Sequence, residues 1–357
     1  MRFALLSSVL IVLLSRPGTL GAQETVITVF DSARIEHDPE LTDGTQRDGY
    51  VVRNSGRTIE TAIRLPAAPQ NHRDDRRIVA TVTVKPLSPE THGRRRPGDE
   101  WTRLGSVTLL LQRPGETRTT EVELMRFTTG FGGPGTFHQD LTALAPLLSG
   151  AKTLRLFIST FQKPAWEASL TLTYSSRGVG YRRPVYAQPL FHNPLVTAQQ
   201  PRLRASVRIP NGLARPRLRI LTTGHATDGI GGDEFISRTH LLRIDGEEIA
   251  RWRPWCESGG TLRPLNPTSG RERIDGRELW SSDLDRSGWH PGMVVQPLVI
   301  PVPELTAGRH EIELEIIKIR QKDESNARGY WRVSAVIVAD EPWPDAEQGG
   351  DPTPNQP

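Results

Sequence analysis

The sequence predicts an all-β protein made of two tandem antiparallel sandwiches or jelly rolls. Three observations lead to this prediction: apolar and polar residues alternate in many short runs, clusters of Gly, Pro, Asn and Asp separate the runs, and helical periodicity is scarce. Such alternation is typical of strands with one face on a core and the other in water. The chain is long enough for two domains with sizeable cores, so stability does not require a disulfide.

The first series of strand-like runs fills the amino-terminal half. It comprises residues 78–84, 107–111, 120–125, 154–158 and 168–174. The segment 128–135, TTGFGGPG, is a loop that only a glycine-rich backbone can follow. Asp140 precedes a short candidate helix and is expected to cap it.

A second series follows and predicts a second domain. It comprises residues 203–209, 217–222, 240–244, 294–302, 310–319 and 331–339. Residues 175–201, rich in Pro and Arg, separate the two series, so we expect domains over 23–180 and 181–340. The long irregular stretch 252–291 is of a kind that is usually functional. Residues 341–357 contain Pro, Gly and acids without a core and are expected to be a disordered tail.

The first 22 residues are predicted to be a signal peptide. Arg2 is followed by roughly a dozen mostly apolar residues, then by Pro17, Gly18 and a small-residue end at Ala22. This run is too short to cross a bilayer of roughly 30 Å comfortably as a helix. We therefore expect export to the periplasm or the extracellular space, cleavage near Ala22, and a mature protein that does not span the membrane.

Composition argues against nucleic acid as a partner. The formal charge is only +4, and acids or prolines interrupt or flank the basic clusters at 73–77 and 94–96. Nucleic-acid binding needs a continuous basic stripe with stacking aromatics. The single cysteine, Cys256, cannot form an internal disulfide and is buried, free or paired with another chain.

Several motifs do not look like scaffold. In the second half they are TTGH (222–225), GDEF (232–235), RTH (238–240) and DRSGWHPGM (285–293). In this order and spacing they resemble the carboxy-terminal domain of the flavobacterial-type peptide-N-glycosidase F family. In the first half GDEWTRL (98–104) is similar to that family's D-E-W-D-R motif.

The resemblance implies a fold and a reaction. The fold would be two eight-stranded jelly rolls packed side by side, and the reaction cleavage of the bond between an asparagine side chain and the first sugar of an N-glycan. The implied partner is a glycan or glycopeptide, bound in a cleft between the domains. No cofactor or metal is implied, and we expect a monomer.

The catalytic positions of the family are only partly kept. Thr102 stands where the family has the aspartate that acts on the attacking water, and Ser159 stands where it has a second acid. A threonine hydroxyl has no useful basicity near neutral pH. The third acid matches Glu234, and the family's arginine matches Arg286. Degenerate amidase chemistry is therefore expected.

The resemblance also implies residues that contact the substrate, and here alternatives stay open. The residues are Trp101, Arg103, Phe161, His225 and Trp289. Trp289 either stacks on a sugar or packs under a loop. Asp99 and Glu100 are expected to order their loop by pairing with Arg103 or the cluster at 94–96.

Two other functions compete with the binding-only interpretation. One is an active amidase with a rearranged site, in which Glu234 is the acid and Arg286 the oxygen clamp. The other is a copper-dependent peptide monooxygenase, since His225 and His240 are possible ligands. That class needs a His-x-His pair, which the sequence lacks. Cys256 matches half of a family disulfide whose other position is His290, and a nucleophilic or metal-binding Cys–His pair is a further alternative.

Overall fold

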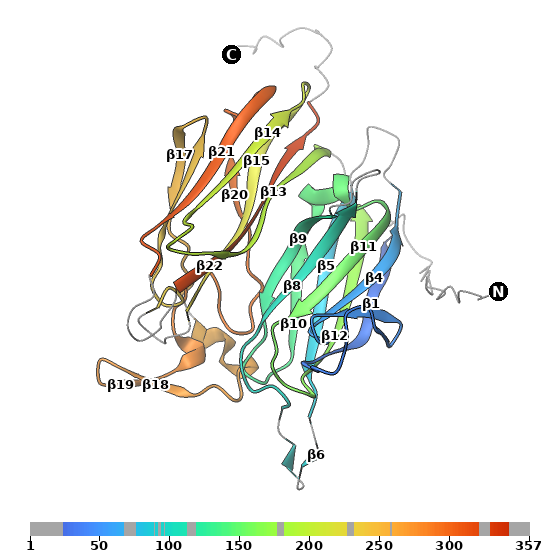
Figure 1. The fold of residues 1–357 in the computed structure, drawn as a ribbon, viewed down its shortest axis with the longest axis vertical. Helices are drawn as coiled ribbons and strands as arrows, with labels where there is room; N and C mark the ends of the chain where they lie inside the picture. Colours follow the sequence, from blue (N-terminus) through green and yellow to red (C-terminus); the bar gives the residue numbers. More distant parts are fainter. Residues whose placement is uncertain are drawn as a thin grey trace, which may run out of the picture.

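The computed structural model describes residues 24–67, 76–88, 90–91, 94–95, 97–112, 119–176, 182–226, 232–257, 259–320 and 329–342. The expected signal peptide and nearly all of the expected tail lie outside these residues. Within them the chain is almost entirely β, and all strand pairs are antiparallel, so the predicted fold class is confirmed. Two sandwiches lie side by side (Figure 1).

The first sandwich packs a four-stranded sheet against a six-stranded one. The four-stranded sheet has the order β1 (Thr25–Ile35), β12 (Trp166–Ser176), β5 (Arg76–Pro86) and β10 (Gly135–Asp140). The six-stranded sheet has the order β2 (Gln46–Arg47), β3 (Tyr50–Arg53), β4 (Thr58–Leu65), β11 (Gly150–Ile158), β8 (Leu104–Gln112) and β9 (Thr119–Thr128). A short hairpin, β6 (Glu90–Thr91) and β7 (Arg94–Arg95), projects from one end.

The second sandwich has two four-stranded sheets. One has the order β13 (Pro184–Val196), β22 (Gly329–Asp340), β15 (Ala214–Ala226) and β20 (Leu298–Pro301). The other has the order β14 (Arg202–Ile209), β21 (Gly308–Ile317), β16 (Thr239–Ile244) and β17 (Glu247–Trp252). The long irregular stretch contains two 3-10 helices, η3 (Gly259–Leu265) and η4 (Ser281–Asp283), and the hairpin β18 (Arg271–Ile274)–β19 (Arg277–Trp280).

Alternation along the strands builds the cores, as the sequence predicts. In β5 the side chains of Ile78, Ala80, Val82 and Val84 are buried and their neighbours are not. The pairing partner β12 shows the same period. All predicted runs but two fall inside strands: the run 310–319 extends two residues beyond the end of β21 at Ile317, and in residues 294–302 only Leu298–Pro301 is strand.

Residues 175–201 were expected to separate the two series, but they contain the long strand β13. Prolines hide this strand, because proline lacks the N–H that a sheet interior needs. β13 lies at the edge of its sheet, where proline is tolerated, and its register shifts near Pro184 and Pro189. β12 ends at Ser176 and β13 begins at Pro184, on either side of residue 180.

The predicted helix near Asp140 is the 3-10 helix η1 (Thr142–Leu147). The N-cap is Leu141, not Asp140 as expected, and its side chain makes no capping hydrogen bond. The Asp140 carboxylate, one residue earlier, accepts a hydrogen bond from the Thr142 N–H at 2.8 Å and so still contacts the start of the helix. Leu144 and Ala145 bury their side chains in the first core.

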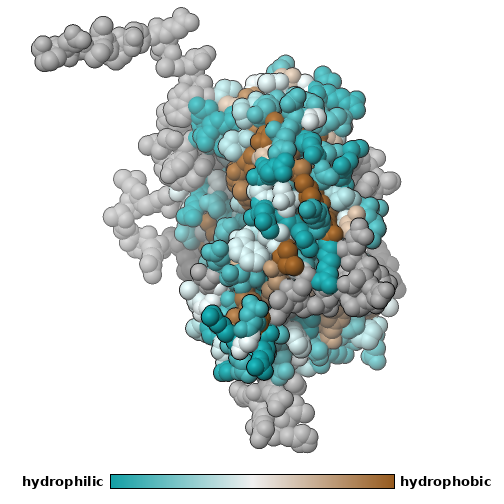
Figure 2. All heavy atoms as spheres, turned by 90° about the vertical axis from the view of Figure 1, so that its left-hand side faces the viewer, coloured by the Kyte–Doolittle hydropathy of each residue, from teal (hydrophilic) through white to brown (hydrophobic). Residues whose placement is uncertain are grey.

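Ion pairs cover the sheet of the second sandwich that consists of β14, β21, β16 and β17. Arg243 contacts Glu313 and Glu315 at 2.8 Å each, and Arg202 and Arg204 pair with the same two acids. Figure 2 looks at the molecule from the left-hand side of Figure 1, and hydrophilic side chains cover most of what it shows. Solvent therefore meets this sheet, and the opposite sheet faces the first sandwich.

The two sandwiches share a buried seam. Val336 and Val338 of β22 belong to the hydrophobic cluster of the first sandwich. Beside them Arg126 of β9, 2% exposed, binds Glu123 through two nitrogens at 2.7 and 2.6 Å. Its third nitrogen donates to Thr223 Oγ1 at 2.9 Å and to the Arg332 carbonyl at 2.7 Å, both in the second sandwich.

The ion pair is completed from the other side. Ser334 Oγ donates to Glu123 Oε2 at 2.5 Å. Burial alone would raise the pKa of Glu123, but Arg126 and Ser334 hold it below its usual value. Glu123 is therefore an anion, and its charge holds Arg126, which hydrogen-bonds strands β15 and β22 of the second sandwich.

We expect Glu123→Ala to lower the free energy of unfolding by about 3–5 kcal/mol, because it leaves Arg126 charged and unpaired in the seam. Urea unfolding of the whole chain measures this. The control is Glu248→Ala, whose ion pair with Arg251 is exposed (side chains 41% and 57% exposed); we expect a much smaller loss, because solvent screens this pair. Equal losses in the two variants would contradict the role given to Glu123.

Candidate functional site

The DEWTR motif is organised around a buried carboxylate. Asp99, fully buried, accepts hydrogen bonds from Arg103 Nε at 2.7 Å and Arg103 Nη2 at 3.0 Å. Thr160 Oγ1 donates to the same carboxylate at 2.6 Å, and the Trp101 N–H at 3.2 Å. Both oxygens of the Asp99 carboxylate are therefore occupied by hydrogen bonds that order this loop, and neither is open to a substrate. The same contacts hold Arg103 directly before β8, at one end of the six-stranded sheet.

Thr102 is committed to the backbone. Its hydroxyl donates to the Thr129 carbonyl at 2.7 Å, and the N–H of Gly292, from the PGM motif, donates to the same oxygen at 3.2 Å. One carbonyl thus connects the DEWTR motif of the first sandwich to the DRSGWHPGM motif of the second. Ser159 lies beside this point, since its N–H donates to the Leu104 carbonyl at 2.9 Å.

Glu234 and Arg286 form an ion pair at the end of the second sandwich. Arg286 Nε lies 2.9 Å from Glu234 Oε1; the arginine side chain is 1% exposed and that of the glutamate 19%. Arg286 also donates to the Leu284 carbonyl at 2.9 Å, and its guanidinium lies over the rings of Phe235 and Trp289. The surviving acid is therefore held by a buried cation that the protein orients on several sides.

Trp289 and His225 lie beneath this pair. Trp289 is 4% exposed and donates its indole N–H to the Gly224 carbonyl at 2.9 Å. His225 is also buried and stacks on Trp289 and on Tyr330, with ring centroids 5.6 and 5.2 Å away. Of the two alternatives for Trp289, the buried position favours packing, because a ring this buried offers no open face to a sugar.

Burial keeps the neighbouring histidines neutral. Desolvation, followed by Arg332 and Arg126, lowers the pKa of His225 well below its ordinary value. Desolvation lowers the pKa of His240 to about 4. His240 Nδ1 donates to the Arg238 carbonyl at 3.1 Å, and Nε2 then accepts from Thr222 Oγ1 at 2.9 Å. Both ring nitrogens of His240 are thus occupied by hydrogen bonds.

Cys256 is a free thiol next to the Arg286 backbone. Burial, with a contribution from Asp285, raises its pKa to about 11, which is the opposite of what a nucleophilic thiol needs. Burial also lowers the pKa of His290. In the part of the chain that the structure describes, no three His, Cys, Asp or Glu side chains are grouped as metal ligands.

The remaining residues expected to contact a substrate are Trp101, Arg103 and Phe161. They lie at the end of the six-stranded sheet where β8 begins, which we call the rim. Trp101 and Phe161 are 62% and 61% exposed, and the Arg103 guanidinium lies 5.3 Å from the Phe161 ring centre. Thr268 Oγ1 of the second sandwich donates to the Glu100 carbonyl at 2.6 Å. The exposed aromatics therefore stand next to the junction between the two sandwiches.

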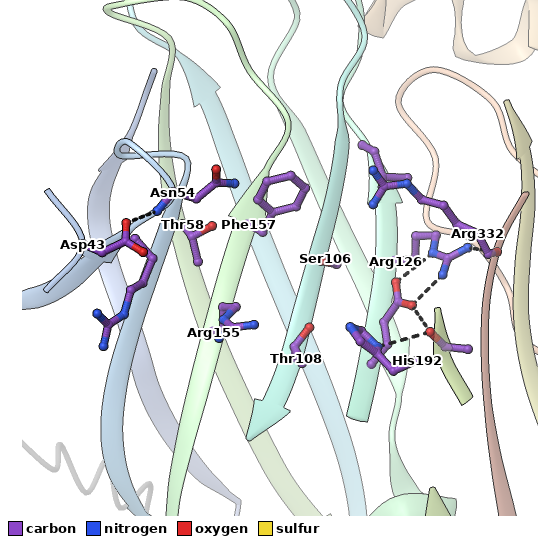
Figure 3. A pocket seen from close by; sticks show the side chains of 14 residues that line it. Asp43, Asn54, Thr58, Ser106, Thr108, Arg126, Arg155, Phe157, His192 and Arg332 are labelled. Atoms are coloured by element: carbon purple, nitrogen blue, oxygen red, sulfur yellow. Dashed lines mark hydrogen bonds and ion pairs between the residues drawn. The ribbon is translucent and has the colours of Figure 1, made fainter. Parts of the chain in front are cut away.

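A polar trough of about 330 Å³ lies along the six-stranded sheet (Figure 3), and its lining includes Leu104, the residue after Arg103. Ser106, Thr108 and Phe157 form its floor, and Asp43 and Asn54 lie on one side. The other side carries Arg126, Arg332 and His192, the last two from the second sandwich. Sequence reasoning missed these residues, since nothing in the chain signals that β13 and β22 face the first sheet.

The class of the protein follows from this arrangement: two antiparallel β-sandwiches that meet along a polar trough, with an acid–arginine pair near one end. Residues 193–338 match the family described as "Peptide-N-glycosidase F, C terminal". With this match over the second sandwich and the shared fold reported next, the chain resembles the peptide-N-glycosidase F family.

Solved structures have the same fold over most of the chain. A structure of PNGF-II aligns with a TM-score of 0.74 and 23% identity over 90% of this chain and 65% of that one. PNGase F, described as a glycosylasparaginase from Flavobacterium meningosepticum, gives 0.67 and 18% over 89% and 96%. A peptide-N(4)-(N-acetyl-beta-D-glucosaminyl) asparagine amidase gives 0.67 and 20% over 90% and 97%.

The chain thus spans about two thirds of the length of PNGF-II. Comparison with curated proteins gave no match. Among the described residues, no helix is long and apolar enough to cross a membrane.

We expect acid to destabilise the protein through His240. Below pH 6.5 the unfolded chain binds a proton that the folded state takes up only near its lowered pKa of about 4, so stability falls as the pH falls. His240→Gln should reduce the loss between pH 7 and pH 5 by about 2 kcal/mol. Chemical unfolding at both pH values measures it.

His310 provides the control of opposite sign. Its hydrogen bond to Asp245, at 2.7 Å, raises its pKa, so its stabilising effect is largest at low pH. His310→Gln should therefore make the loss towards pH 5 larger. A His240→Gln variant with the same pH dependence as the parent would overturn this account.

Proposed function

We propose that this is an exported protein that binds N-glycans or glycopeptides in the cleft between its sandwiches and has lost standard amidase activity. The proposal rests on the family match of residues 193–338, on the leader-like opening of the sequence and, above all, on Thr102. Its hydroxyl donates to the Thr129 carbonyl, at the position where the family has the acid that acts on water.

The other two catalytic positions support the same proposal. Ser159 carries no carboxylate, and Glu234 is ion-paired with the buried Arg286. A general base has to accept a proton from the attacking water, which an acid neutralised by a buried cation does poorly. With one paired acid in place of three, little remains to activate water.

The exposed aromatic residues of the rim are suited to binding a glycan. Trp101 and Phe161 offer exposed ring faces, and exposed aromatics beside polar groups are typical of binding sites. The trough next to them has hydroxyl groups from Ser106 and Thr108 and the ring of Phe157. Trp289 and Arg286 would act by holding the end of the second sandwich in place, and His225 would pack beneath them.

A second candidate, an active amidase with a rearranged site, is favoured by one observation. The Glu234 side chain is 19% exposed although it is paired with the buried Arg286, so the acid can still be reached from solvent. In this case Glu234 would be the only acid. The two candidates differ in whether they release glycan.

The decisive assay incubates the mature chain with a denatured N-glycoprotein and measures free glycan and conversion of asparagine to aspartate. We expect no release. Release that Glu234→Gln abolishes would overturn the binding-only proposal. In the same assay Thr102→Asp combined with Ser159→Glu tests the scaffold: release by the double variant alone would show that only the acids are missing.

Binding is tested separately on a glycan array. We expect Trp101→Ala and Phe161→Ala to weaken binding about tenfold or more, because each removes an exposed ring. Val26→Ala, an exposed apolar position on β1, is the matched control and should leave binding unchanged. Unchanged binding in both aromatic variants would contradict the assignment of the rim.

A further inference from the structure

A second, basic groove lies at the other end of the seam, where β22 ends and η1 begins. Its volume is about 810 Å³. It is lined by five arginines and only two aspartates, a formal excess of three positive charges: Arg77, Arg182, Arg215, Arg217, Arg219, Asp140 and Asp340. Val336, buried in the first core, lies between this groove and the trough along β22, so the two are separate sites.

Arg219 is the residue that needs an explanation. It is 4% exposed, and one nitrogen donates to the Leu124 carbonyl at 2.9 Å. No carboxylate of the described residues forms an ion pair with it. Burial lowers its pKa to about 10, with partial compensation from Glu123 and Asp140, so the side chain is still a cation at neutral pH. A buried cation without a paired anion is costly, and a bound anion would remove that cost.

The other charges in the groove do not supply the missing anion. Asp340 pairs with Arg217 at 2.7 Å and lies 3.9 Å from Arg215. Asp140 pairs with Arg77 at 3.3 Å. Both acids are thus paired with arginines other than Arg219. Arg215, whose side chain is 59% exposed, contacts Asp340 at the longer distance of 3.9 Å.

Apart from Thr142 and Ser176, the rest of the lining is apolar. Ala143, Pro184, Val299 and Val338 contribute to the walls, and Val299 is 49% exposed. Guanidinium groups bind tetrahedral oxyanions through paired N–H donors, and apolar surface suits the faces of sugar rings. A ligand that combines both is a saccharide carrying sulfate or phosphate esters.

We propose that this groove binds a sulfated or phosphorylated saccharide, with Arg219 and Arg215 as its main contacts to the ester groups. The site is independent of the glycan cleft and of any amidase activity. Because the contacts are ionic, affinity should fall as salt rises.

The experiment titrates the whole mature chain with a heparin hexasaccharide, its desulfated counterpart, a phosphorylated oligomannose and inorganic sulfate. We expect binding of at least one esterified saccharide, and weaker binding of the desulfated sugar by about tenfold or more. Equal binding of the sulfated and desulfated sugars, or binding of inorganic sulfate as tight as that of the best saccharide, would overturn the proposal. The preferred ester distinguishes sulfate from phosphate.

Variants locate the site. Arg215→Gln is exposed and should fold normally, and Arg219→Gln removes the buried cation; each should weaken binding of the esterified saccharide about tenfold. Arg309→Gln, 78% exposed on β21, is the matched control and should bind as the parent does. Trp101→Ala should also leave this binding intact, which separates the result from the glycan cleft. If Arg215→Gln binds as tightly as Arg309→Gln, the groove is not the site.

Discussion

The buried pair of Glu123 and Arg126 is the interaction on which the relation between the two sandwiches depends. Glu123 is held by a serine from β22, and Arg126 donates to a threonine of β15 and a carbonyl of β22. A charge removed from water requires nearly all of its hydrogen bonds, and these are available in one relative position of the sheets. The pair therefore fixes the position of the two sandwiches relative to each other along the apolar seam. That position in turn sets the shapes of the trough and of the basic groove.

The relative position of the sandwiches also determines how the DEWTR and PGM motifs meet. The backbone contacts of Thr129 bring them together with Thr102 at the position where, on the proposed function, the relatives have an acid. Thr102 donates a hydrogen bond to a backbone carbonyl, which an ionised carboxylate could not do because its oxygens only accept hydrogen bonds. Loss of the acid is thus compatible with a well-ordered junction.

Strand alternation made most of the fold predictable, because half-buried strands repeat with period two whatever they pair with. β13 escaped prediction because its prolines resemble a linker, and only the edge position, a property of the whole sheet, makes them acceptable. The pairing of Asp99 with Arg103 was predictable from their proximity in the chain. The burial of Trp289 and the roles of Arg126, Arg332 and Arg219 were not, since each depends on which sheet faces which, and spacing along the sequence does not encode that.

The prolines of β13 have one more consequence, which concerns other molecules. An edge strand presents a row of N–H and C=O groups to which a strand from a second chain can add, and this is a common start of aggregation. Pro184, Pro189 and Pro194 interrupt the donors of that row, and the register shifts bend the strand. A strand from another chain would therefore find an incomplete row of donors along β13. The irregularity that concealed β13 in the sequence thus also makes this edge a poor template for pairing with a second chain.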